Sequence, residues 1–423
     1  MNATRLRSPR LFGWLRRRPL GLLALLGPGL IAANAGNDAG GIATYASAGS
    51  QFAYRMLFCM VLVTVALVVV QEMSARLGAY TGEGLMSLIR EQFPLRLAAF
   101  AVVCLLVANL GLVVSEFAGI GAALELFGVS RYLTVPIAAV GIWALVVFGS
   151  YRYAERLFLI LSLAFFAYPI AAVLGHPDWS AVVSNSVLPH FVADRQFLFL
   201  AVALVGTTVT PYMQLYQAAA VADRGIGPAE YPAERVDAVF GAVFANVISI
   251  AIIVATAAAI GGHGPLSSAS DAARALEPVA GAGAKALFAV GLLGASALAG
   301  AVVPLSTSYG IAEAVGTERS VSRRFSEARL FLGLFTAQVL LGAGIALVPG
   351  NLIELLLRMQ ILNGLIAPVI LGFLLVLSNR RSVLGDAVNG PRFRVVATVS
   401  VAAIGMLATV VFLQVVLGWL GQG

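Results

Sequence analysis

Long apolar segments separated by short polar connections make up most of the chain, and their length is the first structural signal. An apolar segment of about 18 residues is long enough to cross a bilayer as a helix. We count eleven such segments, so the pattern predicts an all-α polytopic membrane protein with eleven transmembrane helices. The segments are 20–47, 53–75, 97–127, 131–150, 155–175, 196–222, 237–260, 283–315, 327–349, 352–378 and 394–419.

The connections predict shorter elements. Residues 76–94 have the pattern of a short amphipathic surface helix that follows a turn at Thr81-Gly82. Residues 261–283 are punctuated by Gly and Pro, which indicates an external loop, with one short helix at 268–276. The segment 283–315 is long for one crossing and too short for two, so we expect one extended helix there.

Two spans that lie five helices apart are interrupted in the middle. Span 1 contains Gly36-Asn37-Asp38-Ala39-Gly40-Gly41, and span 6 contains Gly206-Thr207-Thr208-Val209-Thr210-Pro211. Glycine loosens a helix, and proline removes a backbone donor and frees a carbonyl. A matching pair of interrupted helices is typical of inverted-repeat transporters whose site lies at the bilayer midplane. We therefore predict a 5+5 inverted repeat with broken helices 1 and 6, followed by one more helix.

This organisation divides the chain into five parts. Residues 1–19 are a basic cytoplasmic tail, 20–175 are repeat 1, 176–195 an external loop, 196–378 repeat 2, and 379–423 a cytoplasmic loop with helix 11. The tail runs into a span too long for a signal peptide and lacks a small-residue cleavage site, so we expect it to be retained.

The basic residues predict the orientation, because cytoplasmic loops are enriched in Lys and Arg. With the N-terminus in the cytoplasm, 21 of the 27 basic residues fall on that side, 5 fall on the other, and Arg358 lies within span 10. The C-terminus is then outside. We expect the chain to be integral to the plasma membrane, which is the inner membrane in a bacterium.

Composition narrows the function classes. The chain is 60% hydrophobic and 11% charged, with a mean hydropathy of +0.93, which excludes an ordinary soluble enzyme. The net charge of +7 is not accompanied by a basic stripe with interleaved aromatic residues, so we expect no nucleic-acid partner. The expected partners are the lipid bilayer and a small substrate; the sequence indicates no protein partner and no cofactor.

Asp38 is the strongest candidate for chemistry. A lone carboxylate in the middle of a membrane helix costs about 2.5–3.5 kcal/mol on insertion scales, so such a residue is a functional candidate by default. It can cap a half-helix that restarts near Ala39, where an anion suits the helix dipole. It can also bind a cation, together with the backbone carbonyls of Ala35 and Thr207 and the hydroxyl of Thr210.

Further polar or small residues are candidates for lining the cavity or pathway. They are Asn34, Asn37, Gly41, Tyr212, Gln217, Glu116 and Asn363. Near the end of span 2, Glu72 can pair with Arg76 at i,i+4, in a structural role or as part of an inner gate.

Soft metal ligands are missing from both interruptions. Neither contains Met or Cys, and the three histidines, His176, His190 and His263, fall in predicted external loops. A site of carboxylate, carbonyl and hydroxyl oxygens favours hard cations, so Mg²⁺ and Mn²⁺ are the expected substrates.

At these residues the chain resembles the Nramp (natural resistance-associated macrophage protein) family of divalent-metal transporters. The resemblance lies in Gly27-Pro28-Gly29-Leu30-Ile31-Ala32-Ala33 leading to Asp38, in the segment from Gln71 to Gly78, and in Gly206 to Tyr212. It covers roughly residues 20–375. It implies a LeuT-like fold of eleven helices and divalent metal transport.

The departures from the family pattern are specific. The family's Asp-Pro-Gly-Asn is Asp38-Ala39-Gly40-Gly41 here, and its Met-Pro-His is Thr210-Pro211-Tyr212. A second family histidine corresponds to Gln217. The acidic residues of the third family helix fall on Ser115 and Ala118, with Glu116 on another face.

This pattern is similar to the Nramp-related magnesium transporter branch. That branch implies Mg²⁺ and Mn²⁺ carried partly hydrated, without proton coupling. We therefore expect a secondary transporter, not an enzyme, that moves divalent cations by alternating access.

Three alternatives stay open. One is a proton-coupled Mn²⁺ importer of the ordinary Nramp type. Another is a Na⁺-coupled amino-acid carrier, in which a half-helix N-terminus receives the substrate carboxylate, although Asp38 would repel that anion. A third is a sensor or scaffold that binds metal without moving it.

Overall fold

The computed structural model describes residues 37–148, 163–192, 194–316 and 328–420. Within these ranges the chain forms helices and no β-strand. Eight helices are long and apolar enough to cross a membrane, and α7 (Arg131–Val147) is a shorter apolar helix. The eight comprise α4 (Leu57–Thr81), α6 (Leu95–Glu125), α11 (Arg195–Thr208) with α12 (Pro211–Asp223), α13 (Tyr231–Ile260), α16 (Ala284–Val315) with the short helices before it, α17 (Arg329–Ala346), α18 (Leu352–Ser378) and α20 (Pro391–Leu420).

The predicted fold class, an all-α polytopic membrane protein, is confirmed by these helices. The segment 283–315 is the single extended helix α16, as predicted. The second part of span 1 is α3 (Ala39–Phe52), and the end of span 5 is η3 (Leu163–Phe166) with α9 (Ala167–Leu174). The count of eleven and the inverted repeat stay predictions, because the tail 1–19, the start of span 1 and residues 149–162 lie outside the described residues.

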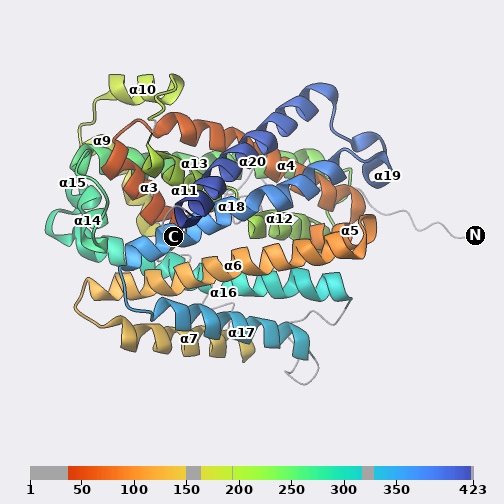
Figure 1. Cartoon of the computed structure of the whole chain (residues 1–423), viewed down its shortest axis with the longest axis horizontal. Coiled ribbons are helices and arrows are strands. Elements are labelled where there is room, and N and C mark those ends of the chain that lie inside the picture. Colours follow the sequence, from red (N-terminus) through yellow and green to blue (C-terminus); the bar gives the residue numbers. More distant parts are fainter. Residues whose placement is uncertain (1–36, 149–162, 193, 317–327, 421–423) are drawn as a thin grey trace, which may run out of the picture.

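The helices pack in two groups on either side of α18 (Figure 1). In one group α6 lies against α16, with α7 and α17 packed on their outer side. In the other, α3 and α4 pack against α13, and α12 packs against α4. The long helix α18 contacts α6 on one side and α11 on the other, and α20 covers its outer face. Helices α3, α11 and α12 therefore lie on the side of the second group, and all three contact α18.

Short helices occupy the two ends of the bundle. Next to the end of α4 lie α5 (Leu85–Gln92), α19 (Arg381–Leu384) and η6 (Gly385–Ala387) (Figure 1). At the opposite end lie α10 (Trp179–Val187), α14 (Ala269–Ala273), η4 (Arg274–Leu276), α15 (Glu277–Ala280) and η5 (Gly281–Gly283). The short helix predicted at 268–276 is confirmed by α14 and η4, and Ser268 with Asp271 forms a capping box at its start.

The amphipathic surface helix follows the turn at Thr81-Gly82, as predicted. Helix α4 continues to Thr81 and ends at Gly82, whose φ of 68° lies in the left-handed region that suits glycine. Only then does α5 begin, with Leu85, Leu88 and Ile89 among its buried residues. Span 2 extends beyond the apolar segment 53–75 of the sequence, and Arg76 is a buried member of α4 and not a surface residue.

Arg76 lies in a network of charged and polar side chains at the end of α4. Its guanidinium is 3.1 Å from the Glu72 carboxylate, which confirms the predicted i,i+4 pair, and it also donates to Asn389 and to the Ala387 carbonyl. Glu72 in turn accepts a hydrogen bond from Tyr231 of α13. The network therefore joins α4, α13 and the segment before α20, and it leaves neither buried charge without a partner.

The two Glu–Arg pairs at i,i+4 spacing allow a direct test of this network. The Glu72–Arg76 side chains are 5% and 9% exposed, whereas those of Glu354–Arg358 in α18 are 58% and 68% exposed. Removing one partner of a buried pair costs about 3 kcal/mol, and removing an exposed i,i+4 pair about 0.3–0.5 kcal/mol.

We expect Arg76→Ala to lower the thermal unfolding midpoint in detergent clearly and Arg358→Ala to leave it nearly unchanged. Equal midpoints for the two variants would contradict a stabilising role for the buried pair.

Candidate functional site

Asp38 stands at the start of the half-helix α3. Its side chain accepts a hydrogen bond of 2.6 Å from the backbone N–H of Gly41, so it caps the helix that begins at Ala39. The predicted restart near Ala39 is confirmed. The residue is 1% exposed, and its second carboxylate oxygen, Oδ2, makes no hydrogen bond to the protein. A buried carboxylate thus keeps one oxygen directed at no protein donor.

The predicted interruption of span 6 is also confirmed. Helix α11 ends at Thr208, and α12 begins at Pro211. Thr210 between them has an extended backbone, with φ −67° and ψ 141°. In an α-helix the carbonyl of Thr207 would accept from the N–H of residue 211, but proline has none, so this carbonyl has no helical donor. The Thr210 hydroxyl is buried and makes no hydrogen bond to the protein.

The start of α3 lies next to the interruption before Pro211. The Tyr45 hydroxyl of α3 is 3.1 Å from the Thr208 hydroxyl of α11. The side chain of Thr207 lies beside the Asp38 carboxylate, and that of Tyr212 is buried close to it. Asp38 and Thr207, which are far apart in the sequence, therefore face the same small region.

Glu116 of α6 faces this region too, which corrects its predicted position on another face. Its Oε2 accepts a hydrogen bond of 3.4 Å from the N–H of Ala39, and the residue is fully buried. The reason is a close crossing of α6 and α3: a β-carbon at Gly119 would lie 2.3 Å from the β-carbon of Ala39. Residues 116 and 119 are one turn apart on α6, so Glu116 faces the start of α3.

Gln360 of α18 is a site residue that the sequence analysis did not identify. It is fully buried, and neither its amide oxygen nor its amide nitrogen makes a hydrogen bond to the protein. A β-carbon at Gly40 would lie 1.7 Å from its Nε2, and one at Gly206 1.9 Å from its backbone carbonyl oxygen. It therefore touches both interrupted helices. The sequence feature that could have identified Gln360 is its position as an amide in the middle of the apolar segment 352–378.

The other predicted residues differ in their distance from Asp38 and in their hydrogen-bond partners. Asn37 accepts a hydrogen bond of 3.1 Å from Ser249 of α13, and the Gly41 N–H binds Asp38. Gln217 donates to Glu234 at 3.0 Å, and Asn363 donates to the Ala108 carbonyl at 3.1 Å, where α18 packs on α6. The last two therefore bind other groups than Asp38. Asn34 and Ala35 lie outside the described residues.

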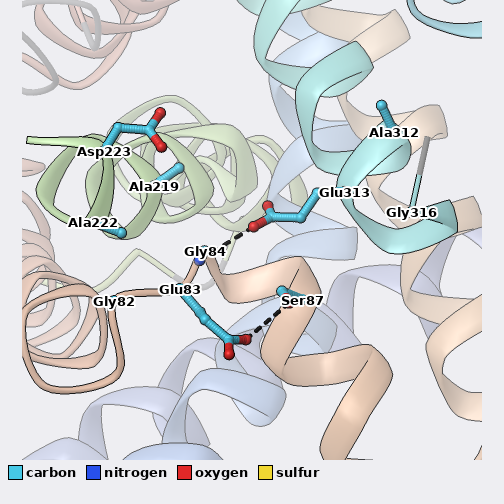
Figure 2. A pocket seen from close by; sticks show the side chains of 10 residues that line it. All are labelled: Gly82, Glu83, Gly84, Ser87, Ala219, Ala222, Asp223, Ala312, Glu313 and Gly316. Atoms are coloured by element: carbon cyan, nitrogen blue, oxygen red, sulfur yellow. Dashed lines mark hydrogen bonds between the residues drawn. The ribbon is translucent and has the colours of Figure 1, made fainter. Parts of the chain in front are cut away.

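An acidic cavity runs along α12 beyond this region. A space of about 280 Å³ holds the carboxylates of Glu83, Asp223 and Glu313 in its lining, and Glu313 accepts from the Gly84 N–H at 3.3 Å (Figure 2). A second space of about 470 Å³ shares Asp223 and Glu313 and reaches Tyr216, one turn from Tyr212. The two spaces lie between α12 and α16, and their shared acidic residues Asp223 and Glu313 outnumber the one cationic residue in the second lining, Arg224.

The donor set near Asp38 determines which ions it suits. It offers carboxylate, hydroxyl, amide and backbone carbonyl oxygens, which are ligands of hard cations. Buried polar atoms without protein partners are uncommon and indicate water or an ion. In the described ranges no three residues among His, Cys, Asp and Glu come together. An ion here would be held by two carboxylates at most and by neutral oxygens.

Comparisons with known proteins agree with this geometry. Residues 29–414 match the model of the natural resistance-associated macrophage protein-like (Nramp) family. The chain is 28% identical to a divalent metal cation transporter MntH of Verminephrobacter eiseniae over 94% of this chain and 91% of that protein. It is 34% identical to one from Ralstonia nicotianae over 65% of each.

Solved structures show the same fold. A manganese transporter of Eremococcus coleocola, crystallised with an aromatic bis-isothiourea compound, matches with a TM-score of 0.77 and 19% identity, over 96% of this chain and 88% of that one. The transporter MhsT in complex with L-phenylalanine matches with a TM-score of 0.54 and 15% identity, over 94% and 98%.

The contact of Gly206 with Gln360 leads to a prediction on stability. Gly206→Ala places a methyl group against the α18 backbone, and overpacking of this kind costs about 1–3 kcal/mol. A control is Gly372→Ala in α18, the helix that Gly206 of α11 contacts, because a β-carbon at Gly372 meets nothing within 4 Å.

We expect the unfolding midpoint to fall for Gly206→Ala and to stay equal or rise for Gly372→Ala. The close approach of α11 and α18 would be refuted if Gly206→Ala unfolded at the wild-type temperature.

Proposed function

The chain belongs to the natural resistance-associated macrophage protein-like (Nramp) family, and from this premise we propose that it carries Mg²⁺ or Mn²⁺ across the membrane by alternating access. The observation that carries the proposal is the Asp38 carboxylate, buried where two helices are interrupted, with one oxygen that no protein group binds. A divalent cation would neutralise this charge, and its binding would repay the cost of burying it.

The proposed ligands surround Asp38. The Thr207 carbonyl is freed by Pro211, and the Thr210 hydroxyl has no other partner. The Ala35 carbonyl belongs to the same proposal from sequence, and the buried amide oxygen of Gln360 adds a ligand from α18. Gly41 leaves space beside Asp38 for water. These five protein oxygens leave room for water in an octahedral shell, which suits an ion that keeps part of its hydration shell, as Mg²⁺ does.

Alternating access is proposed to use the acid-lined space beside α12. The carboxylates of Asp223 and Glu313 attract cations to the end of the helix that begins at the site. We propose that the two five-helix repeats move relative to each other during transport. In this proposal the N-terminus is in the cytoplasm and the C-terminus is outside.

One observation favours a second candidate function, a proton-coupled Mn²⁺ importer. Glu116 is a second carboxylate, fully buried and bound to the N–H of the residue that follows Asp38. A buried carboxylate without a cationic partner is a plausible proton acceptor, and its position beside the cation ligand would couple the two. The resemblance to the magnesium transporter branch implies no coupling, whereas the position of Glu116 supplies a proton site that a coupled carrier would use.

The amino-acid carrier is less well supported. Its substrate carboxylate would need the free N–H groups at the start of α3, but Asp38 already binds the Gly41 N–H and Glu116 binds that of Ala39. Two carboxylates at this helix start would repel a third. The likeness to MhsT therefore supports the fold and not the substrate.

We predict that Asp38→Asn abolishes divalent transport. The amide keeps the cap on α3 but removes the charge, and we expect Mg²⁺ and Mn²⁺ uptake into proteoliposomes to fall on the order of a hundredfold, or about 2.7 kcal/mol of cation binding. Asp178→Asn is the matched control, because Asp178 caps α10 by the same bond, to the Ala181 N–H at 3.1 Å.

Unfolding midpoints of both variants should match the wild type, which separates lost transport from lost folding. Uptake by Asp38→Asn at the wild-type rate would refute the proposed site.

Internal pH recorded during Mn²⁺ uptake separates the two candidate functions. The uncoupled carrier is expected to take up Mn²⁺ without a change of internal pH. Acidification that follows uptake in the wild type and disappears in Glu116→Gln would establish the proton-coupled importer instead. Uptake of Ca²⁺ in the same vesicles reports on how strongly the site prefers smaller ions.

A further inference from the structure

Exposed arginines gather at the end of the molecule where α5, α19 and the start of α20 meet. Arg96 follows the first residue of α6, Arg381 begins α19, and Arg392 and Arg394 lie in the first turn of α20. All four side chains are exposed. We call these four residues, together with Arg380, the arginine patch. The nearest acidic residues along the chain are Glu91 and Asp386.

Direct contacts bring the members of the patch together. Arg380 donates to the Gln92 carbonyl at 2.8 Å, and its guanidinium lies 4.4 Å from the centre of the Phe93 ring. Because Phe93 precedes α6 by two residues, this contact places Arg380 near the start of α6, the helix that carries Arg96. Asn379, next to Arg380, accepts a hydrogen bond of 3.0 Å from Arg394. The patch is thus one surface built from α6, α19 and α20.

Three charges of the patch have no carboxylate partner among the described residues. Among the described residues no carboxylate forms an ion pair with Arg96, Arg381 or Arg392. Elsewhere arginines are paired, as Arg131 is with Glu125 at 2.8 Å. Two arginines in the first turn of α20 also stand at the positive end of its helix dipole, which is unfavourable without an anion nearby.

Exposed apolar stripes begin directly beyond the arginines. On α6 the stripe contains Leu97, Phe100, Val103 and Val107, and on α20 it contains Val395, Val399 and Met406. Val395 is 63% exposed and Met406 67%. In a membrane protein such stripes face lipid chains, so the arginines lie at the level of the lipid headgroups.

We propose that the arginine patch is a binding surface for anionic phospholipids, with headgroup phosphates on Arg96, Arg381 and Arg392 and acyl chains along the stripes of α6 and α20. Guanidinium groups bind phosphate oxygens through charged hydrogen bonds. Basic clusters next to transmembrane helices attract anionic lipid by an amount that corresponds to about fivefold in affinity for each arginine. The surface does not involve the cation site, so the proposal is independent of what the chain transports.

The test is native mass spectrometry of the purified full chain titrated with phosphatidylglycerol or phosphatidylcholine. The patch variant is Arg96→Gln, Arg381→Gln and Arg392→Gln together, three side chains that make no hydrogen bond to another described residue. The matched control is Arg55→Gln, Arg274→Gln and Lys285→Gln, three exposed cations at the opposite end of the bundle. Both triple variants change the net charge equally.

We expect the wild type and the control to prefer phosphatidylglycerol, and the patch variant to lose on the order of a hundredfold in affinity for it. Replacing the same three arginines by lysine should restore most of the preference. The proposal is overturned if the patch variant binds phosphatidylglycerol like the wild type, or if the control loses as much. Competition by inorganic phosphate at low concentration would also overturn it, because the surface would then bind a free anion and not lipid.

Discussion

A carboxylate buried between two interrupted helices is the constraint on which the rest of this structure depends. Asp38 can lie there because the Gly41 N–H binds one of its oxygens and because the start of a helix stabilises an anion. The interruption of the partner helix before Pro211 brings a carbonyl without a donor to the same region. A bound cation would interact favourably with both the carboxylate and this carbonyl. This is the physical basis of the proposed transport.

Close helix crossings keep these groups in place. Gly206 lies against the backbone of Gln360, and Gly119 lies against Ala39, so α18 and α6 approach the two interruptions more closely than larger side chains would allow. Small residues at helix interfaces allow van der Waals contact where the hydrophobic effect contributes little. The same crossings bring Gln360 and Glu116 to the site. Packing and ligand placement therefore depend on the same glycines.

Charged residues in the interior have charged or polar partners, whereas several arginines at one end of the bundle have no carboxylate partner among the described residues. Inside, Arg76 and Glu72 bind each other and several neighbours, because an unpaired charge there would be costly. At the surface near α19, Arg96, Arg381 and Arg392 form no ion pair with a described carboxylate, which is tolerated where water or an anionic headgroup surrounds them. The end of the bundle near α19 therefore carries a concentration of exposed positive charge that the apolar middle does not have.

The sequence by itself determined the fold class, most of the spans, the interruption before Pro211 and the position of Asp38 at a helix start. These follow from chain-local features: apolar length, a proline without an N–H, and a carboxylate next to glycines. It did not determine that Glu116 faces Asp38, that Gln360 lies between the interrupted helices, or that Gln217 and Asn363 bind other groups. A helix that is apolar on almost every side carries no periodic signal of which side faces the core, so the rotation of α6, α12 and α18 was decided only by tertiary packing.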